Sequence, residues 1–410
     1  MKNDPLEGRE VQAGSRNRVF PCPAGILVAL CFLAVASLSA QGDSPDPFEF
    51  RKQQTGYFGP DGEDLDPSRI DEVLIAYFGP EDSMHPLHGG LWISLKIAEQ
   101  GINASGGIKG KPLRIVPVWT EDPWKGGISD MVRELYLHNI LAVIGSVDSA
   151  STHLLEQIAA KIRIPVISPI SSDKSANLAN VPWLFSMIPG DHSLAGLMVE
   201  KAAALLEEND PLILISGLDH DSRLLTREFS SLLSERKIAP EMAFEYDPGL
   251  PLPWNRIRNQ PRIFAVIASA EESASLAGEI RKRWPHAEII GGPMMGRARF
   301  ANLCGSDCSN VIYASPGECP PDGDFSRTFA RQTGRTPDYA EGSVYDSLRL
   351  LGEALEKSGF NRARLLREIR SLPPWTGITG TVNWDPLGHN TRKGSIEILT
   401  VPASSAGREE

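Results

Sequence analysis

The sequence lacks the short signatures of the common nucleotide and ester chemistries. No Gly-x-Gly-x-x-Gly follows the first apolar segment, and there is no Gly-x-x-x-x-Gly-Lys-Ser/Thr phosphate loop and no Gly-x-Ser-x-Gly nucleophile elbow. The eight histidines are scattered, and His85 and His88 have no Glu or Cys at metal-ligand spacing. A catalytic role for Asp219-His220-Asp221 is disfavoured, because lone histidines in loops are usually solvated. We therefore expect no enzyme, no catalytic residues, no metal and no cofactor.

Cysteine is also scarce, with five residues in 410. Cys22 and Cys31 lie near the N-terminus, which leaves Cys304, Cys308 and Cys319 for the body of the chain. Three cysteines without a nearby histidine lack the paired spacing of a zinc site. An exported chain permits a disulfide, and either Cys304–Cys308 or Cys308–Cys319 would close a small loop with one thiol left over.

Basic residues are outnumbered, 41 against 52 acidic, for a net charge of -11. This balance argues against nucleic acid or an anionic membrane surface as a partner. No run after residue 40 is long and apolar enough to span a bilayer. A hydrophobic content of 41% and the length of the chain suit two domains of roughly 150 residues each.

The N-terminus predicts export. Arg16 and Arg18 precede an apolar run over 24–38, and small residues follow it, so residues 1–40 are predicted to be a signal peptide. An uncleaved N-terminal anchor is the alternative. In both cases the body is placed in the periplasm or otherwise outside the cytoplasm. Residues 41–70 are predicted to be a linker or extended arm, and 403–410 a disordered tail.

From residue 70 onward, short apolar runs alternate with longer amphipathic ones. Strands are predicted at 73–78, 113–119, 141–145, 165–168, 183–187, 211–216, 262–268, 287–291 and 311–314. Helices are predicted at 88–103, 126–138, 151–161, 190–207, 221–236, 271–284, 338–357 and 361–371. Such alternation specifies a parallel sheet with helices on both faces.

Two similar cycles of this alternation predict an α/β protein with two doubly wound, Rossmann-like lobes. The first lobe takes 71–185 plus about 316–380, the second takes about 186–315, and C-terminal strands within 381–402 lie near the hinge. Ligands of open parallel sheets bind beyond the carboxyl ends of the strands. Two facing lobes therefore predict an interlobe cleft that closes on a ligand.

Two serine-rich loops follow adjacent predicted strands of the first lobe. In the loop 145–152, small hydroxyl residues at a helix start leave backbone N–H groups free for a carboxylate or another small anion. Ordinary helix capping by Ser149 or Ser151 also explains this loop. The loop 168–173 repeats the pattern at the same sheet edge, which favours a shared binding site.

Acidic residues gather in the predicted loops of the second lobe. Asp219 and Asp221 follow one strand, and Glu271 and Glu272 follow the next. Acids are common at helix N-termini because the macrodipole favours them. The alternative is that one of these carboxylates pairs with an ammonium group of a ligand.

Several segments in register resemble one family. They are Ile102-Asn-Ala-Ser-Gly-Gly-Ile-Lys-Gly-Lys-Pro-Leu113, Ile144-Gly-Ser-Val-Asp-Ser-Ala-Ser-Thr152, Pro165-Val-Ile-Ser-Pro169, Leu184-Phe-Ser-Met-Ile-Pro-Gly-Asp191, Tyr345-Asp346 with its helix, and Gly377-Ile-Thr-Gly-Thr-Val-Asn-Trp-Asp-Pro-Leu-Gly388. Over residues 70–400 the chain resembles the type I periplasmic solute-binding proteins, in the branched-chain amino-acid (Leu/Ile/Val-binding) branch that serves ABC importers.

The resemblance implies a site in the interlobe cleft. Ser149 and Ser172 match the hydroxyl residues that hold the ligand's carboxylate and ammonium, Ile170 supplies a backbone contact, and Ala150 adjoins Ser149 in the same loop. The second-lobe pattern departs from the family, so Asp221 or Glu271 is expected to serve as the partner of a cation.

An aromatic residue that the family places after the first strand is also missing. Met84 or His85 stands there instead and is expected to form a wall of the first lobe. With both departures, the solute need not be an α-amino acid, and an amide is an alternative.

The resemblance thus implies a non-catalytic receptor that captures a small polar solute, an amino acid or an amide-like compound, for the ABC-type permease of an importer. A ligand sensor or scaffold of the same fold, signalling to a membrane partner, is the alternative. An enzyme on a doubly wound fold is a remote third hypothesis.

Overall fold

The computed structural model describes residues 70–119, 128–173, 175–176 and 183–399. All of them fall within one unit of the chain, Arg51–Glu410. The predicted signal peptide, the tail and all but the last residue of the predicted arm lie outside the described residues. Within the described ranges, no helix combines the length and apolar character needed to cross a membrane.

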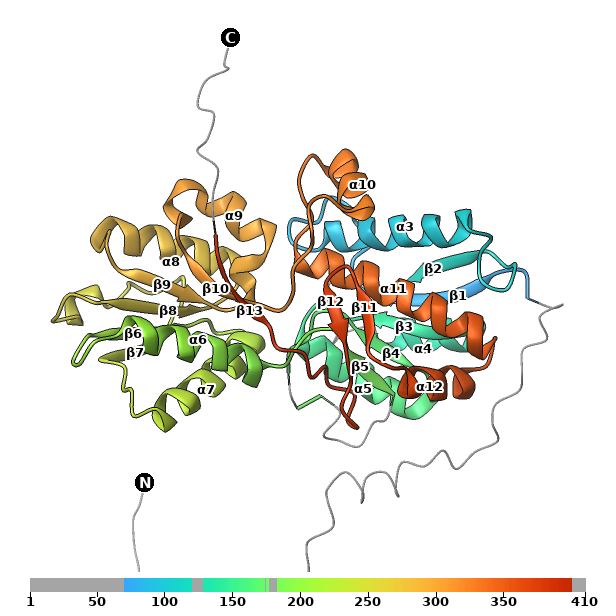
Figure 1. The fold of residues 1–410 in the computed structure, drawn as a ribbon, viewed down its shortest axis with the longest axis horizontal. Coiled ribbons are helices and arrows are strands. Elements are labelled where there is room, and N and C mark those ends of the chain that lie inside the picture. The colour runs from blue at the N-terminus through green and yellow to red at the C-terminus, as the bar shows by residue number, and fades with distance from the viewer. Residues whose placement is uncertain (1–69, 120–127, 174, 177–182, 400–410) are drawn as a thin grey trace, which may run out of the picture. The chain divides into compact units, whose positions relative to one another are not determined.

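The first lobe is built on a parallel sheet with the strand order β2-β1-β3-β4-β5 (Figure 1). The strands are β1 (Val73–Phe78), β2 (Leu113–Pro117), β3 (Ile140–Gly145), β4 (Val166–Ser168) and β5 (Leu184–Ser186). Every residue of β1 and β3 is buried, as expected when helices cover both faces of a sheet. Between the strands run α3 (Gly89–Ala104), α4 (Ile128–Leu137) and α5 (Ser149–Ile162).

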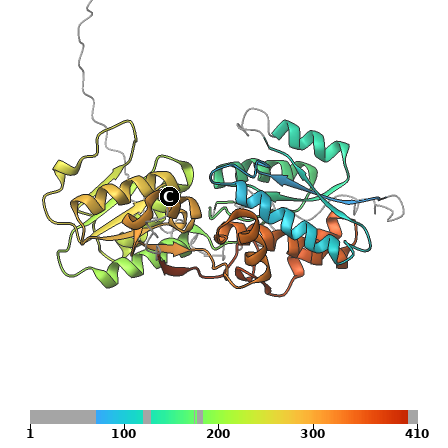
Figure 2. The ribbon, with the colours of Figure 1, turned by 90° about the horizontal axis from the view of Figure 1, so that it is seen from above.

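The chain returns to this lobe near its end. Helix α11 (Tyr339–Ser358) packs beside α3, and α12 (Arg362–Ser371) packs on α11 (Figures 1 and 2). The return also brings α10 (Asp324–Thr333) and a hairpin of β11 (Trp375–Gly377) and β12 (Gly380–Val382). Trp375 and Val382 of the hairpin pack on the hydrophobic core of the first lobe.

The second lobe has the strand order β13-β10-β9-β8-β6-β7. Its strands are β6 (Leu212–Ser216), β7 (Met242–Glu245), β8 (Ile263–Ile267), β9 (Glu288–Gly291), β10 (Ile312–Ser315) and β13 (Ser395–Ile398). Its longer helices are α6 (Asp191–Leu205), α7 (His220–Glu235), α8 (Ala270–Arg283) and α9 (Ala298–Cys304). The pairings within β6–β10 are parallel, whereas β13 runs antiparallel to β10.

Side chains of β6 alternate between the two faces of this sheet. Leu212 and Leu214 join the core beneath α6 and α7, while Ile213 and Ile215 join the core beneath α8. This double burial explains the continuous apolar run of the strand. The Cys304–Cys308 disulfide closes the end of α9 in the same lobe, and Cys319 is free.

Hydrogen bonds explain the conformation of two of the segments that resemble the family, 102–113 and 377–388. After α3, the Asn103 side chain accepts from the Leu113 N–H at 2.7 Å and donates to the Leu113 carbonyl at 2.8 Å, which fixes the start of β2. Between them, Gly107 adopts a φ of 74°, and a Cβ there would lie 2.0 Å from the Lys111 carbonyl oxygen. In α11, the Asp346 carboxylate accepts the N–H groups of Ile378 and Thr379, each at 2.9 Å.

Candidate functional site

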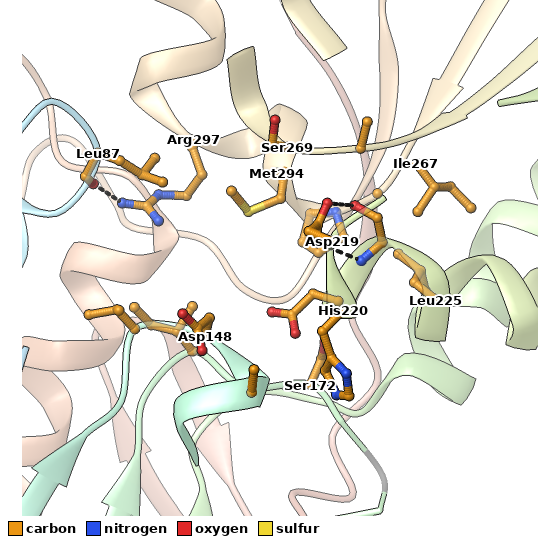
Figure 3. A pocket seen from close by; sticks show the side chains of 18 of the residues that line it. Leu87, Asp148, Ser172, Asp219, His220, Leu225, Ile267, Ser269, Met294 and Arg297 are labelled. Atoms are coloured by element: carbon orange, nitrogen blue, oxygen red, sulfur yellow. Dashed lines mark hydrogen bonds between the residues drawn. The ribbon is translucent and has the colours of Figure 1, made fainter. Parts of the chain in front are cut away.

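A cavity of about 270 Å³ lies between the carboxyl ends of strands from both sheets. The first lobe contributes Leu87, His88, Val147, Asp148, Ala150, Ile170, Ser172 and Tyr339. Asp191 begins α6, and the rest of the second-lobe lining is Asp219, His220, Asp221, Ser222, Leu225, Ile267, Ala268, Ser269, Gly292, Pro293, Met294 and Arg297 (Figure 3). The volume suits a small molecule.

The loop after β3 places the N-terminus of helix α5 at the cavity. Asp148 caps this helix, because its carboxylate accepts from the Ser151 N–H at 2.7 Å. Ala150 lines the cavity. Ser149 lies directly beside it, is buried, and accepts a hydrogen bond from the Ser171 hydroxyl at 2.9 Å.

A carboxylate of the second lobe reaches the first residue of α5. The Ser149 N–H donates to both oxygens of Asp221 at 3.2 Å, so the protein's own acid fills the position predicted for a ligand anion. Burial, and then the charge of Asp148, raise the pKa of Asp221 to about 6, although the Ser149 hydrogen bonds oppose this shift.

The second serine loop is joined to the start of α6. The Ser172 hydroxyl donates to an Asp191 carboxylate oxygen, and the Asp191 N–H donates to the Ser172 carbonyl at 2.8 Å. Burial raises the pKa of Asp191 well above its ordinary value, and the charge of Asp221 adds to the increase, while the Ser172 hydrogen bond opposes it. The Ser172 hydroxyl oxygen keeps its capacity to accept a hydrogen bond.

Hydrogen-bond acceptors dominate the polar part of the lining. Asp219 caps α7 by accepting from the Ser222 N–H at 2.9 Å, and with Asp148, Asp191 and Asp221 it makes four carboxyl groups at the cavity. This set favours a ligand that supplies N–H donors or a positive charge.

The guanidinium of Arg297 is already paired. It donates from Nε to Asp338 at 2.9 Å and from an NH2 group to the Leu87 carbonyl at 2.7 Å, and the side chain is 2% exposed. Asp338 holds a lowered pKa: burial would raise it, but the charge of Arg297 and the Ala298 N–H outweigh burial. This buried ion pair neutralises the positive charge of Arg297, which lines the cavity.

Histidine His88 presents a neutral ring to the same cavity. Burial, followed by the charge of Arg297, lowers its pKa to about 3. Its Nδ1 is buried and has no hydrogen-bond partner among the described residues. A buried polar atom of this kind is costly unless a ligand or water satisfies it. The apolar part of the lining includes Leu87, Val147, Ile170, Leu225, Ile267 and Met294.

Some of the predicted site residues line the cavity and others do not. Ala150, Ile170, Ser172 and Asp221 line the cavity, and Ser149 touches it only through its contact with Asp221.

Besides Ser149, three predicted residues lie outside the cavity lining drawn from the described part of the chain. Met84 is 84% exposed, and the His85 ring stacks on His88, which with Leu87 forms this wall instead. Glu271 pairs with Arg299 at 2.9 Å.

Several residues that line the cavity were not predicted from the sequence. Asp148 stands inside the quoted serine loop and Asp191 ends the quoted crossover segment, so their placement after a strand was a usable signal. Arg297 gave no such signal, because its role depends on Asp338, which lies 41 residues away along the chain.

The two lobes, each built on a mainly parallel sheet, and the cavity between them have the arrangement of the type I periplasmic binding fold. Comparison with known proteins confirms this fold. Residues 86–216 match the model of a family described as Periplasmic binding protein. A comparison with curated protein sequences finds no match.

Solved structures of solute-binding proteins share the fold. An ABC transporter substrate-binding protein from Desulfitobacterium hafniense, in complex with Leu, superposes with a TM-score of 0.65 at 21% identity over 80% of this chain and 98% of its own. The leucine-binding protein LivK from Thermotoga maritima superposes with a TM-score of 0.68 at 18% identity, over 80% of this chain and 95% of its own. LivJ from Streptococcus pneumoniae, in complex with isoleucine, superposes with a TM-score of 0.69 at 16% identity, over 80% of this chain and 96% of its own.

Proposed function

We propose that this protein is an extracytoplasmic receptor that captures a small polar solute between its lobes, unchanged, for the permease of an ABC importer. The observation that carries the proposal is the cavity at the carboxyl ends of strands from both sheets. A ligand that contacts both lobes binds the closed arrangement better than the open one and so shifts the population toward it.

The lining favours a solute with an amine or amide group and a short apolar part. Four carboxyl groups accept from N–H donors, and the buried Nδ1 of His88 offers a further polar contact. The apolar wall around Leu225 and Met294 accepts the rest of the molecule. An amino-acid carboxylate reaches the Ser149 N–H only by displacing Asp221.

A thermal-shift screen tests this class of solute. Amino acids, primary amides, short peptides and polyamines are compared with dicarboxylates, all with EDTA present. A solute at 100 times its dissociation constant stabilises by about 2.7 kcal/mol. We expect stabilisation by amines, amides or amino acids. Stabilisation by dicarboxylates alone, or by none of these compounds, rejects the proposed class.

Calorimetric titration with a solute that stabilises the protein in this screen tests the role of Ser172. Ser172→Ala is expected to weaken binding by roughly 1–3 kcal/mol, because a buried hydrogen bond to the solute is lost. Ser358→Ala, at the far end of α11, is the matched control and should leave the affinity unchanged. Equal affinities in the two variants would remove Ser172 from the site.

Export and transport need separate measurements. The mass of the exported protein distinguishes a cut near Ala40 from a retained anchor. Loss of uptake of the labelled solute in a strain without this protein supports the importer role, and unchanged uptake contradicts it.

A further inference from the structure

Three side chains converge at the edge of the cavity, next to Ser172. Imidazole nitrogens of His153 and His220 and a carboxylate oxygen of Asp173 all lie within 4.8 Å of one another. His153 belongs to α5 and Asp173 to the loop after β4, both in the first lobe. His220 is the first residue of α7, in the second lobe. The cluster therefore spans the two lobes.

Both imidazoles point at one oxygen. Nε2 of His153 lies 2.7 Å from Oδ2 of Asp173, and Nε2 of His220 lies 3.5 Å from the same atom. The two rings meet edge to face, with an interplanar angle of 88° and ring centroids 6.0 Å apart. Two imidazoles and one carboxylate form a ligand set suited to zinc and neighbouring divalent transition metals.

The surrounding contacts hold these groups in ligating orientations. The Glu156 carboxylate lies 3.1 Å from Nδ1 of His153, which matches the carboxylate–histidine pairs that fix a ligating tautomer. The Ser175 N–H donates to Oδ1 of Asp173 at 2.7 Å, so Oδ2 faces the imidazoles. The Asp173 side chain is 2% exposed, and its oxygen is therefore held in place by its surroundings.

We propose that His153, Asp173 and His220 bind a divalent transition-metal ion of the zinc type across the cleft. Tetrahedral zinc with bonds of about 2.0–2.1 Å separates its ligand atoms by roughly 3.3 Å, which these side chains reach by small rotations. Three protein ligands leave the fourth position to water or to the solute. This proposal departs from the sequence-based expectation of no metal.

The site goes beyond solute capture, because the ion couples metal binding to the arrangement of the lobes. Only the closed arrangement supplies the third ligand, His220, from the second lobe. The ion therefore binds the closed form more tightly than the open form and favours closure. Calcium and magnesium prefer oxygen ligands and serve as negative probes.

Calorimetric titration of the exported, untagged and EDTA-stripped chain tests the site. We expect one Zn²⁺ per chain and no Mg²⁺. His220→Ala and Asp173→Asn should each bind Zn²⁺ at least about 10-fold more weakly. His192→Ala, which removes an exposed histidine of α6 paired with Glu228, is the matched control and should bind as the original chain does. Circular dichroism establishes that each variant is folded.

Small-angle scattering gives a second, independent readout. Zn²⁺ should decrease the radius of gyration of the original chain and leave that of His220→Ala unchanged. Absence of Zn²⁺ binding, or equal binding by His220→Ala and the original chain, overturns the proposal. Because the solute screen contains EDTA, failure of this site is distinguishable from failure of the receptor function.

Discussion

Burial controls the ionisation of Asp191, which faces the cavity from the start of α6. Its side chain is 3% exposed, and burial raises its pKa well above the ordinary 3.8. A carboxyl group with a higher pKa in the folded state binds its proton more tightly when the chain is folded. The higher pKa therefore lowers the stability of the fold at pH values above the unfolded pKa, and this penalty disappears as the pH falls toward the unfolded value.

We predict that Asp191→Asn raises the melting temperature at pH 7.5 by roughly 2–4 °C, the shift that about 1 kcal/mol produces. The gain should shrink on acidification and vanish near pH 4, where the folded Asp191 is protonated. Calorimetric scans from pH 4 to pH 8 measure it, with the exposed Asp322→Asn as control. A gain that does not change with pH would contradict this account of Asp191.

Among single residues, those whose position in the site depends on the local sequence were the predictable ones. Ala150, Ile170 and Ser172 could be predicted because they lie in two serine-rich loops that follow predicted strands and that resemble the loops of the family. Contacts across the cleft could not be predicted. His153 and His220 meet only when the two lobes come together, and nothing in either local sequence indicates the other.

Among the elements, α8 is held by reciprocal contacts at its start. The Ser269 hydroxyl accepts from the Glu272 N–H at 3.2 Å, and the Glu272 carboxylate accepts from the Ser269 N–H at 3.3 Å. This capping box satisfies two N–H groups that the helix leaves free. It also fixes the direction in which Ser269 meets the cavity.

Ser269→Ala is predicted to lower the free energy of unfolding by about 1 kcal/mol, since the cap of α8 is lost. Ser234→Ala, in the last turn of α7, removes an exposed hydroxyl and should change stability by less than about 0.5 kcal/mol. Urea denaturation compares the two variants. If both lose the same free energy, the cap contributes nothing specific to α8.

Strands buried on both faces were the most predictable elements. The predicted runs at 73–78, 141–145, 211–216 and 262–268 each match a fully buried strand to within one residue at either end. β7 was not predicted, because this edge strand alternates half-buried and exposed residues and has no continuous apolar run. β13 was predicted near the hinge, and its antiparallel pairing with β10 depends on a return of the chain that local sequence does not encode.

For the whole molecule, Arg297 is a contact between the lobes. It lies before α9 in the second lobe and bonds to Asp338 and to the Leu87 carbonyl in the first. Asp338 also accepts the Ala298 N–H at 3.0 Å, so one carboxylate joins the starts of α9 and α11. Removing one member of such a buried pair leaves an uncompensated charge.

We predict that Arg297→Ala lowers the free energy of unfolding by about 3–5 kcal/mol. Arg299→Ala is the matched control, because its partly exposed pair with Glu271 stays within the second lobe and contributes less than about 1 kcal/mol. Urea denaturation of both variants measures the difference. Equal losses would show that the interlobe pair does not stabilise the molecule.

The central claim is that a small solute binds between the lobes at the carboxyl ends of their strands. A crystal structure of the protein with the most stabilising solute from the screen tests it most directly. The account predicts solute density inside the cavity, in contact with Ser172 from the first lobe and with Asp221 or Leu225 from the second. Density for the solute on an outer surface, with this cavity filled by water alone, would contradict it.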